Sequence, residues 1–131
     1  MKLKGIGAAE GIAVARLWHM EVVDLSVSHR EGCDPERESK RFADAQHTAA
    51  DELTALYETT RQEDADAAMI FDIHRMMLED LDFCEGVSGL VAGGCNAEWA
   101  VEQTGNMLHD MFQAIDDETM RARAADVKDV A

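Results

Sequence analysis

Proline is almost absent from this 131-residue sequence, which contains only Pro35, and aromatic side chains make up 5% of it. β-Sandwiches and barrels need frequent turns and many β-branched or aromatic strand residues, so both architectures are disfavoured. Alanine, methionine and glutamate, which support helices, are common instead. We therefore expect one mainly α-helical domain, because a chain of this length buries roughly two-thirds of its unfolded surface.

Basic side chains are also scarce, since 12 lysines and arginines stand against 27 aspartates and glutamates and give a formal net charge of -15. Such a charge repels nucleic-acid phosphates and anionic lipid surfaces, so neither nucleic acid nor a membrane is expected as a partner. A basic protein partner fits better. Acidic helix faces that only aid solubility are the alternative, and charge alone does not separate the two.

Cysteine pairs and long apolar runs are missing as well. The three cysteines, Cys33, Cys84 and Cys95, are widely spaced, and the sequence has no CxxC pair, no secretory signal and no apolar run of transmembrane length. This pattern is typical of a reducing compartment. We therefore expect a cytoplasmic protein with reduced thiols.

Motifs for metal binding, cofactor binding and covalent catalysis are absent. None of the histidines lies at a ligand spacing from a cysteine or a second histidine; they are His19, His29, His47, His74 and His109. No G-x-S-x-G elbow and no phosphate-binding loop occurs, and the glycines of residues 5–11 depart by one position from a dinucleotide fingerprint. The sequence predicts no metal site, no cofactor and no catalytic residue.

Two segments precede the helical part. Residues 3–18 combine three glycines with alternating apolar residues from Ile12 onward, the pattern of a glycine-kinked β-strand. A strand without partners leaves half of its backbone groups to solvent, so we expect this orphan strand to belong to a domain that the sequence does not include. Residues 1–21 are thus predicted to form the strand segment, residues 22–33 a linker, and residues 34–131 the helical domain.

Capping residues divide the helical domain into helices. Asp34, Pro35 and Glu36 form a helix start, with an aspartate cap, proline at the first helical position and acid where the helix dipole favours it. Helices are expected over about 35–62, 64–80 and 81–92, from an Asn96 cap through Ile115, and over 119–130. We expect them to pair as a helical bundle of two antiparallel helical hairpins. The last helix has no glycine or proline stop, so it is expected to be truncated.

The second predicted helix has more apolar residues than one buried face requires; they are Met69, Ile70, Phe71, Ile73, Met76, Met77 and Leu78. Methionine is flexible and polarizable, and exposed methionines adapt well to a partner surface. Met76 and Met77 are therefore candidates for the centre of a docking surface. A core position for both is the alternative.

Three stretches carry a family resemblance. Residues 69–83 read M-I-F-D-I-H-R-M-M-L-E-D-L-D-F, residues 96–101 read N-A-E-W-A-V, and residues 115–130 read I-D-D-E-T-M-R-A-R-A-A-D-V-K-D-V. These stretches resemble, in order and register, the corresponding motifs of Enzyme I, the phosphoenolpyruvate-protein phosphotransferase family of the bacterial sugar phosphotransferase system. Together with the glycine-rich N-terminus, the matches cover nearly the whole chain.

The resemblance implies the N-terminal, mostly helical part of that enzyme. In the family, a histidine of a swivelling α/β domain takes phosphate from phosphoenolpyruvate, bound in a magnesium-dependent C-terminal barrel, and passes it to the phosphocarrier protein HPr. That histidine lies in a Gly-Gly-x-x-Ser-His context that this sequence lacks. The resemblance therefore implies a fragment that binds HPr and is inactive alone. It also implies a monomer, since the family dimerises through its C-terminal domain.

Position by position, the resemblance implies an HPr-facing surface made of Asp66, His74, Met76, Met77, Asp80, Asp82, Phe112 and Arg123. Apolar anchors at the middle of an interface carry most of the affinity, and rim charges steer a basic partner. His74 can equally be hydrogen-bonded within the fold, and Arg123 can instead pair with Asp126 or with an acid in the first turn of its helix. Alanines surround Asp66, so the acidic rim is expected to be thinner there than in relatives.

Two other functions stay open at this point. The chain can be the equivalent part of a multiphosphoryl transfer protein or of a nitrogen-type paralogue, which would dock a different carrier. It can also be a structural or dimerising helical bundle without a carrier, in which Met76, Met77 and Phe112 serve as core or self-association residues.

Overall fold

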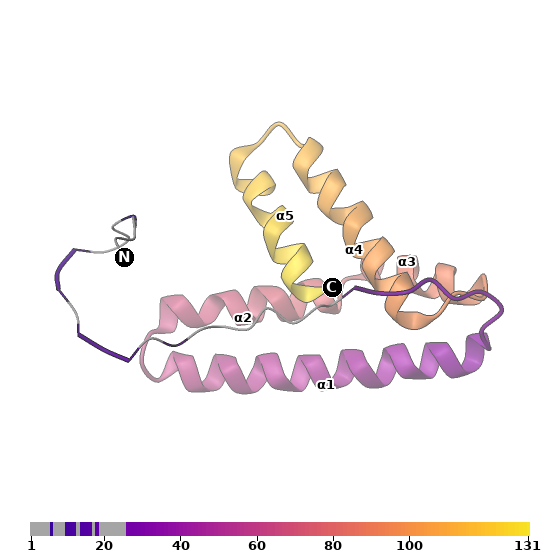
Figure 1. The fold of residues 1–131 in the computed structure, drawn as a ribbon, viewed down its shortest axis with the longest axis horizontal. Helices are drawn as coiled ribbons and strands as arrows, with labels where there is room; N and C mark the ends of the chain where they lie inside the picture. The colour runs from indigo at the N-terminus through magenta and orange to yellow at the C-terminus, as the bar shows by residue number, and fades with distance from the viewer. Residues whose placement is uncertain (1–5, 7–9, 13, 17, 19–25) are drawn as a thin grey trace, which may run out of the picture.

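Five helices make up the part of the chain that the computed structural model describes, which is residues 6, 10–12, 14–16, 18 and 26–131 (Figure 1). The helices are α1 (Pro35–Arg61), α2 (Ala65–Leu78), α3 (Leu81–Ala92), α4 (Ala97–Ala114) and α5 (Glu118–Val130). The mainly α-helical prediction is confirmed, and every predicted helix is present close to its expected ends. Half of residues 3–18, where the orphan strand is predicted, lie outside the described ranges, so the strand stays a prediction.

Aspartate side chains begin four of the helices. Asp34, Asp64, Asp80 and Asp117 each accept hydrogen bonds from backbone N–H groups two or three residues further on, at 2.9–3.3 Å. A cap of this kind stabilises a helix by about 1 kcal/mol relative to alanine. The breaks between these helices are therefore encoded locally, in the residue that precedes each one.

Two antiparallel hairpins, α1–α2 and α4–α5, are present as predicted, and α3 lies between them. Figure 1 shows α1 and α2 side by side, with the α4–α5 hairpin standing across them. The buried core gathers around α3, which supplies Phe83, Val87 and Val91. Phe83 is only 3% exposed, and the centroid of its ring lies 6.3 Å from that of Phe42 in α1. The central helix α3 thus joins both hairpins to one core.

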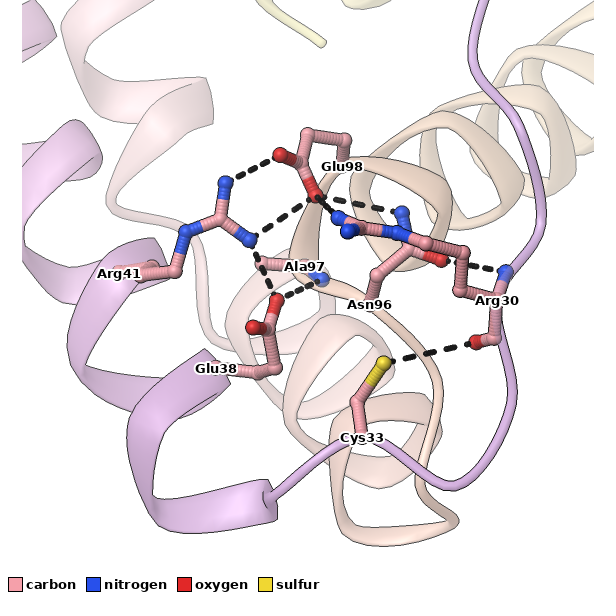
Figure 2. Close-up of polar contacts among 7 residues, drawn as sticks. All are labelled: Arg30, Cys33, Glu38, Arg41, Asn96, Ala97 and Glu98. Atoms are coloured by element: carbon pink, nitrogen blue, oxygen red, sulfur yellow. Dashed lines mark hydrogen bonds and ion pairs between the residues drawn. The ribbon is translucent and has the colours of Figure 1, made fainter.

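A polar junction, made of Arg30, Glu38, Arg41, Asn96 and Glu98, holds the start of α4 against α1 (Figure 2). The buried Glu38 accepts a hydrogen bond from the Ala97 backbone N–H at 2.9 Å and another from Arg41 Nη1 at 2.6 Å. Arg41 also donates to both carboxylate oxygens of Glu98. The guanidinium of Arg41 therefore joins one acid of α1 to one acid of α4.

Asn96 occupies the cap position of α4 that the sequence predicts, but its side chain makes no capping hydrogen bond. Its Oδ1 accepts from the Arg30 N–H at 2.8 Å, and its own N–H donates to the Arg30 carbonyl at 3.2 Å. Glu38 satisfies the α4 N-terminus in its place. The Cys33 N–H donates to the Gly94 carbonyl at 2.9 Å, so the end of the predicted linker is bound to the turn between α3 and α4.

Acid should weaken the polar junction. The hydrogen bond from Arg41 lowers the pKa of Glu98 from 4.5 to about 2. The hydrogen bond from the Ala97 N–H lowers the pKa of Glu38. A carboxylate whose pKa falls on folding stabilises the fold above its unfolded pKa and loses this contribution as pH falls through its folded pKa. We expect the free energy of unfolding to drop between about pH 4.5 and about pH 2.

Thermal unfolding of the wild type and of Glu98→Gln measures this effect. The side chain of Glu98 is 42% exposed, so solvent screening should limit its contribution to about 1 kcal/mol at neutral pH. The difference in melting temperature between the two proteins should shrink toward zero as the pH falls. The control variant Glu58→Gln, at an exposed position of α1, should have the melting temperature of the wild type at every pH. A difference that stays constant with pH would show that Glu98 does not titrate with folding.

Candidate functional site

A groove of about 520 Å³ opens between the end of α2, the start of α3 and the α4–α5 hairpin. Most of the side chains that line it are apolar; these are Ile73, Met76, Met77, Phe83, Leu108, Met111, Phe112, Ile115, Met120, Val127 and Val130. Asp80, Asp82 and Arg123 are the charged residues of the lining. A concave apolar surface with a few placed polar groups is the usual form of a binding site.

Several of the apolar side chains in this groove are open to solvent. Met76 is 62% exposed, Met111 57%, Met120 42% and Ile115 39%. Single exposed apolar residues are common, but a group of them around one hollow marks an interaction surface in soluble proteins. Because three of the four are methionines, this surface can change shape against a partner.

Six of the eight residues that the resemblance implies lie together in this groove: Met76, Met77, Asp80, Asp82, Phe112 and Arg123. They come from α2, α4 and α5, from the first turn of α3 and from the residue that caps α3. These residues are far apart in the sequence, and the packing of the α4–α5 hairpin on α2 and α3 brings them together. The hairpin arrangement therefore creates a common surface from these residues.

The other two implied residues lie elsewhere. Asp66 is exposed in the first turn of α2, at the opposite end of that helix from Met76. The side chain of His74 is 14% exposed, and its Nε2 lies 3.8 Å from Asp126 Oδ1 in α5. His74 thus faces a neighbouring helix, which agrees with the alternative that this histidine acts within the fold.

Two charged residues of the groove also have structural roles. Asp80 caps α3, since its Oδ1 accepts from the Asp82 and Phe83 backbone N–H groups. Arg123 Nη1 donates to Asp126 Oδ2 at 3.2 Å, which is the ion pair that the sequence left as an alternative. Because Asp126 offsets the charge of Arg123, the groove presents mainly the negative charge of its two lining aspartates.

Part of the groove was missed by reasoning from the sequence. Leu108, Met111 and Ile115 of α4 line it beside Phe112, and Met120 of α5 lies among them. The spacing of three and four residues in α4 does indicate one apolar helix face. It does not indicate that the α5 partner leaves this face partly open, which only the hairpin geometry decides.

A second hollow of about 690 Å³ lies between α1 and α4 near the end of α5. It is larger than the groove, but it contains none of the implied residues, and two of its five charged residues, Arg41 and Glu98, are bound to each other. We therefore take the smaller groove as the candidate site.

Of the helices that the structure describes, none combines the length and the apolar character needed to cross a membrane.

Comparison with known proteins agrees with this assignment of the fold. The model of the family described as PEP-utilising enzyme, N-terminal, matches residues 4–123. A phosphoenolpyruvate-protein phosphotransferase of Listeria innocua is 38% identical over 131 residues, and one of Bacillus subtilis is 37% identical over 131 residues. Each match covers 98% of this chain and 23% of the relative. The chain therefore spans about a quarter of the length of these relatives.

Solved structures show the same helical arrangement. The N-terminal domain of Enzyme 1 - Nitrogen has a TM-score of 0.77 and 26% sequence identity, covering 83% of this chain and 47% of that one. A solution structure of Enzyme I has a TM-score of 0.74 over 82% of this chain and 45% of that one, and at 23% identity it supports the fold alone. From its sequence and its fold, the chain belongs to the family of PEP-utilising enzyme N-terminal domains, the family of the N-terminal part of Enzyme I.

Proposed function

We propose that this chain is the docking part of a cytoplasmic phosphoenolpyruvate-protein phosphotransferase, and that its groove binds the phosphocarrier protein HPr. The observation that carries the proposal is the apolar groove around Met76, Met77 and Phe112, with carboxylates at its edge. The names of the relatives support the enzyme class. The family resemblance supports the identity of the carrier.

Apolar and charged groups have separate tasks in this proposal. Methionine and phenylalanine side chains at the centre of the groove lose contact with water when the carrier binds, which supplies most of the affinity. Asp80 and Asp82 and the net charge of -15 attract a basic surface on the carrier and speed its encounter. They also repel acidic proteins, so the same charges contribute to partner choice.

Docking helps phosphate transfer by positioning the carrier. Holding two reactants together turns an encounter in solution into a step within one complex. The phosphohistidine, the phosphoenolpyruvate site and its magnesium belong to parts of the enzyme outside this sequence. The chain alone should therefore bind the carrier as a monomer without transferring phosphate.

A titration of the isotope-labelled chain with unphosphorylated HPr tests the proposal. Amide shifts should cluster on Met76, Met77, Asp82, Phe112 and Arg123, and the affinity should fall as salt screens the acidic edge. Asp82→Asn should reduce the salt dependence while leaving the Asp80 cap of α3 intact. A folded chain that shows no shifts, or shifts confined to α1, would rule out the groove as the HPr site.

A nitrogen-type carrier is the second candidate partner. It is favoured by one observation, the TM-score of 0.77 with the N-terminal domain of Enzyme 1 - Nitrogen. The phosphoenolpyruvate-protein phosphotransferases of Listeria and Bacillus are more similar in sequence, at 37–38% identity against 26%, so HPr remains the first choice. Parallel titrations with the two carriers decide between them, because the cognate one should bind at least about tenfold more tightly.

A further inference from the structure

Three side chains from two helices converge at the contact between α2 and α5. His74 of α2 and Asp126 and Asp129 of α5 bring one ring nitrogen and two carboxylate oxygens within 4.8 Å of one another. Within the part of the chain that the structure describes, these three donor atoms lie close enough together to hold a metal ion. The sequence predicted no metal site, because these residues have no recognisable spacing along the chain.

The Nε2 atom of His74 lacks a hydrogen-bond partner within the described part of the chain. Its Nε2 is buried and makes no hydrogen bond with any described residue, although 14% of the side chain as a whole is exposed. The distance of 3.8 Å to Asp126 Oδ1 is too long for a hydrogen bond. Buried polar atoms are normally paired, and an unpaired one at the centre of a group of donors is a position where a ligand can bind.

The two carboxylates are arranged to leave oxygens free toward the histidine. Arg123 holds Asp126 through Oδ2 at 3.2 Å, so Oδ1 remains directed at His74. Ligating carboxylates in metal sites are commonly oriented by such an outer hydrogen bond. Asp129 follows Asp126 by three residues, which places both carboxylates on one face of α5.

We propose that His74, Asp126 and Asp129 bind a divalent transition-metal ion, of which Zn²⁺ is the best match. One imidazole nitrogen and two carboxylate oxygens suit Zn²⁺, whereas Mg²⁺ and Ca²⁺ prefer oxygen ligands alone. Ligand atoms around a tetrahedral zinc ion lie about 3–3.5 Å apart. The most widely separated donors therefore have to approach each other by up to about 1.5 Å, which the exposed side chain of Asp129 allows.

The bound ion would connect the two hairpins. His74 belongs to α2 and both aspartates to α5, so the ion would add a link between helices that otherwise meet through packing and the His74–Asp126 contact. Three protein ligands leave a fourth position for water. His74, Asp126 and Asp129 lie outside the lining of the groove, so metal binding there does not depend on HPr as the partner.

Calorimetric titration of the full chain with Zn²⁺, and spectroscopic titration with Co²⁺, test this site. One ion should bind per chain, and His74→Ala and Asp129→Asn should each weaken binding at least about tenfold, since even the loss of an outer partner of a ligand has an effect of this size. Asp129 is exposed, so Asp129→Asn keeps the test valid if the His74 variant unfolds. The ion should also raise the melting temperature of the wild type more than that of either variant.

Two controls separate this site from other donors. His47→Ala removes an exposed histidine that lies 3.5 Å from Asp51 on α1, a pair without a third donor, and should leave the affinity unchanged. Co²⁺ bound to the three free cysteines would show thiolate charge-transfer bands, which the proposed site cannot produce. Three results would each overturn the proposal. They are thiolate bands in the Co²⁺ spectrum, equal affinity of Asp129→Asn and the wild type, and a wild type that binds neither Zn²⁺ nor Co²⁺.

Discussion

Met76→Asp should weaken binding of HPr by about 2 kcal/mol or more, which is roughly 30-fold. The side chain of Met76 is 62% exposed and lies in the groove, so a carboxylate there leaves the fold intact but buries an unpaired charge when a carrier docks. Because HPr binding is expected to depend on the apolar centre more than on the rim, this substitution should act more strongly than Asp82→Asn.

Leu56→Asp provides the matched control for Met76→Asp. Leu56 is also an exposed apolar residue, at 47%, but it belongs to α1, which contributes nothing to the lining of the groove. Affinities from calorimetry, with circular dichroism to show that both variants fold, measure the difference. Equal affinity of Met76→Asp and wild type would exclude the groove as the docking centre. A wild-type dimer that dissociates in Met76→Asp would favour the self-association alternative.

Gly86→Ala should destabilise the fold by about 1–3 kcal/mol, although alanine is the better helix former by about 1 kcal/mol. A Cβ on Gly86 of α3 would lie 2.7 Å from Thr104 Cγ2 of α4 and 3.2 Å from its Oγ1. Thr104 is 2% exposed, so its side chain has little room to move away. The added methyl group would push α3 and α4 apart in the region of the core.

Gly89→Ala tests the same substitution in the same helix without the contact. A Cβ at Gly89 meets no atom within 4 Å, so this variant should be as stable as the wild type or more stable by up to about 1 kcal/mol. Urea unfolding of both variants measures the contrast. Thr104→Ala removes both contacted atoms, so combining it with Gly86→Ala should restore part of the free energy of unfolding that Gly86→Ala alone loses. If the two single variants are equally stable, the close approach of α3 and α4 is wrong.

Helix boundaries were predictable because their causes are local. Asp34, Asp64, Asp80 and Asp117 each bond to backbone groups two or three residues ahead, so the relevant interaction is contained in a few consecutive residues. Asn96 shows the limit of this reasoning. Its side chain bonds to Arg30 instead, and Glu38 from α1 caps α4, because a distant carboxylate that tertiary packing brings close can replace a local cap.

The residues that line the groove were partly predictable from the sequence, while their role in docking stays a prediction. The resemblance implied Met76, Met77 and Phe112, which do line one groove, but it also implied Asp66 and His74, which do not. Sequence position specifies the helix and approximate face of a side chain. It does not specify whether a neighbouring helix covers that face, as α5 does for His74.

The amino-acid sequence by itself determined the helical class, the positions of the helix starts, the strong negative charge and the family motifs, since each of these depends on composition or on residues close together in the chain. Tertiary structure alone decided which apolar faces stay open, and it alone brought together the groove, the Glu38 cap and the His74–Asp126–Asp129 cluster. The physical reason is that these features join helices far apart in the sequence, so their geometry is set by how the two hairpins pack around α3.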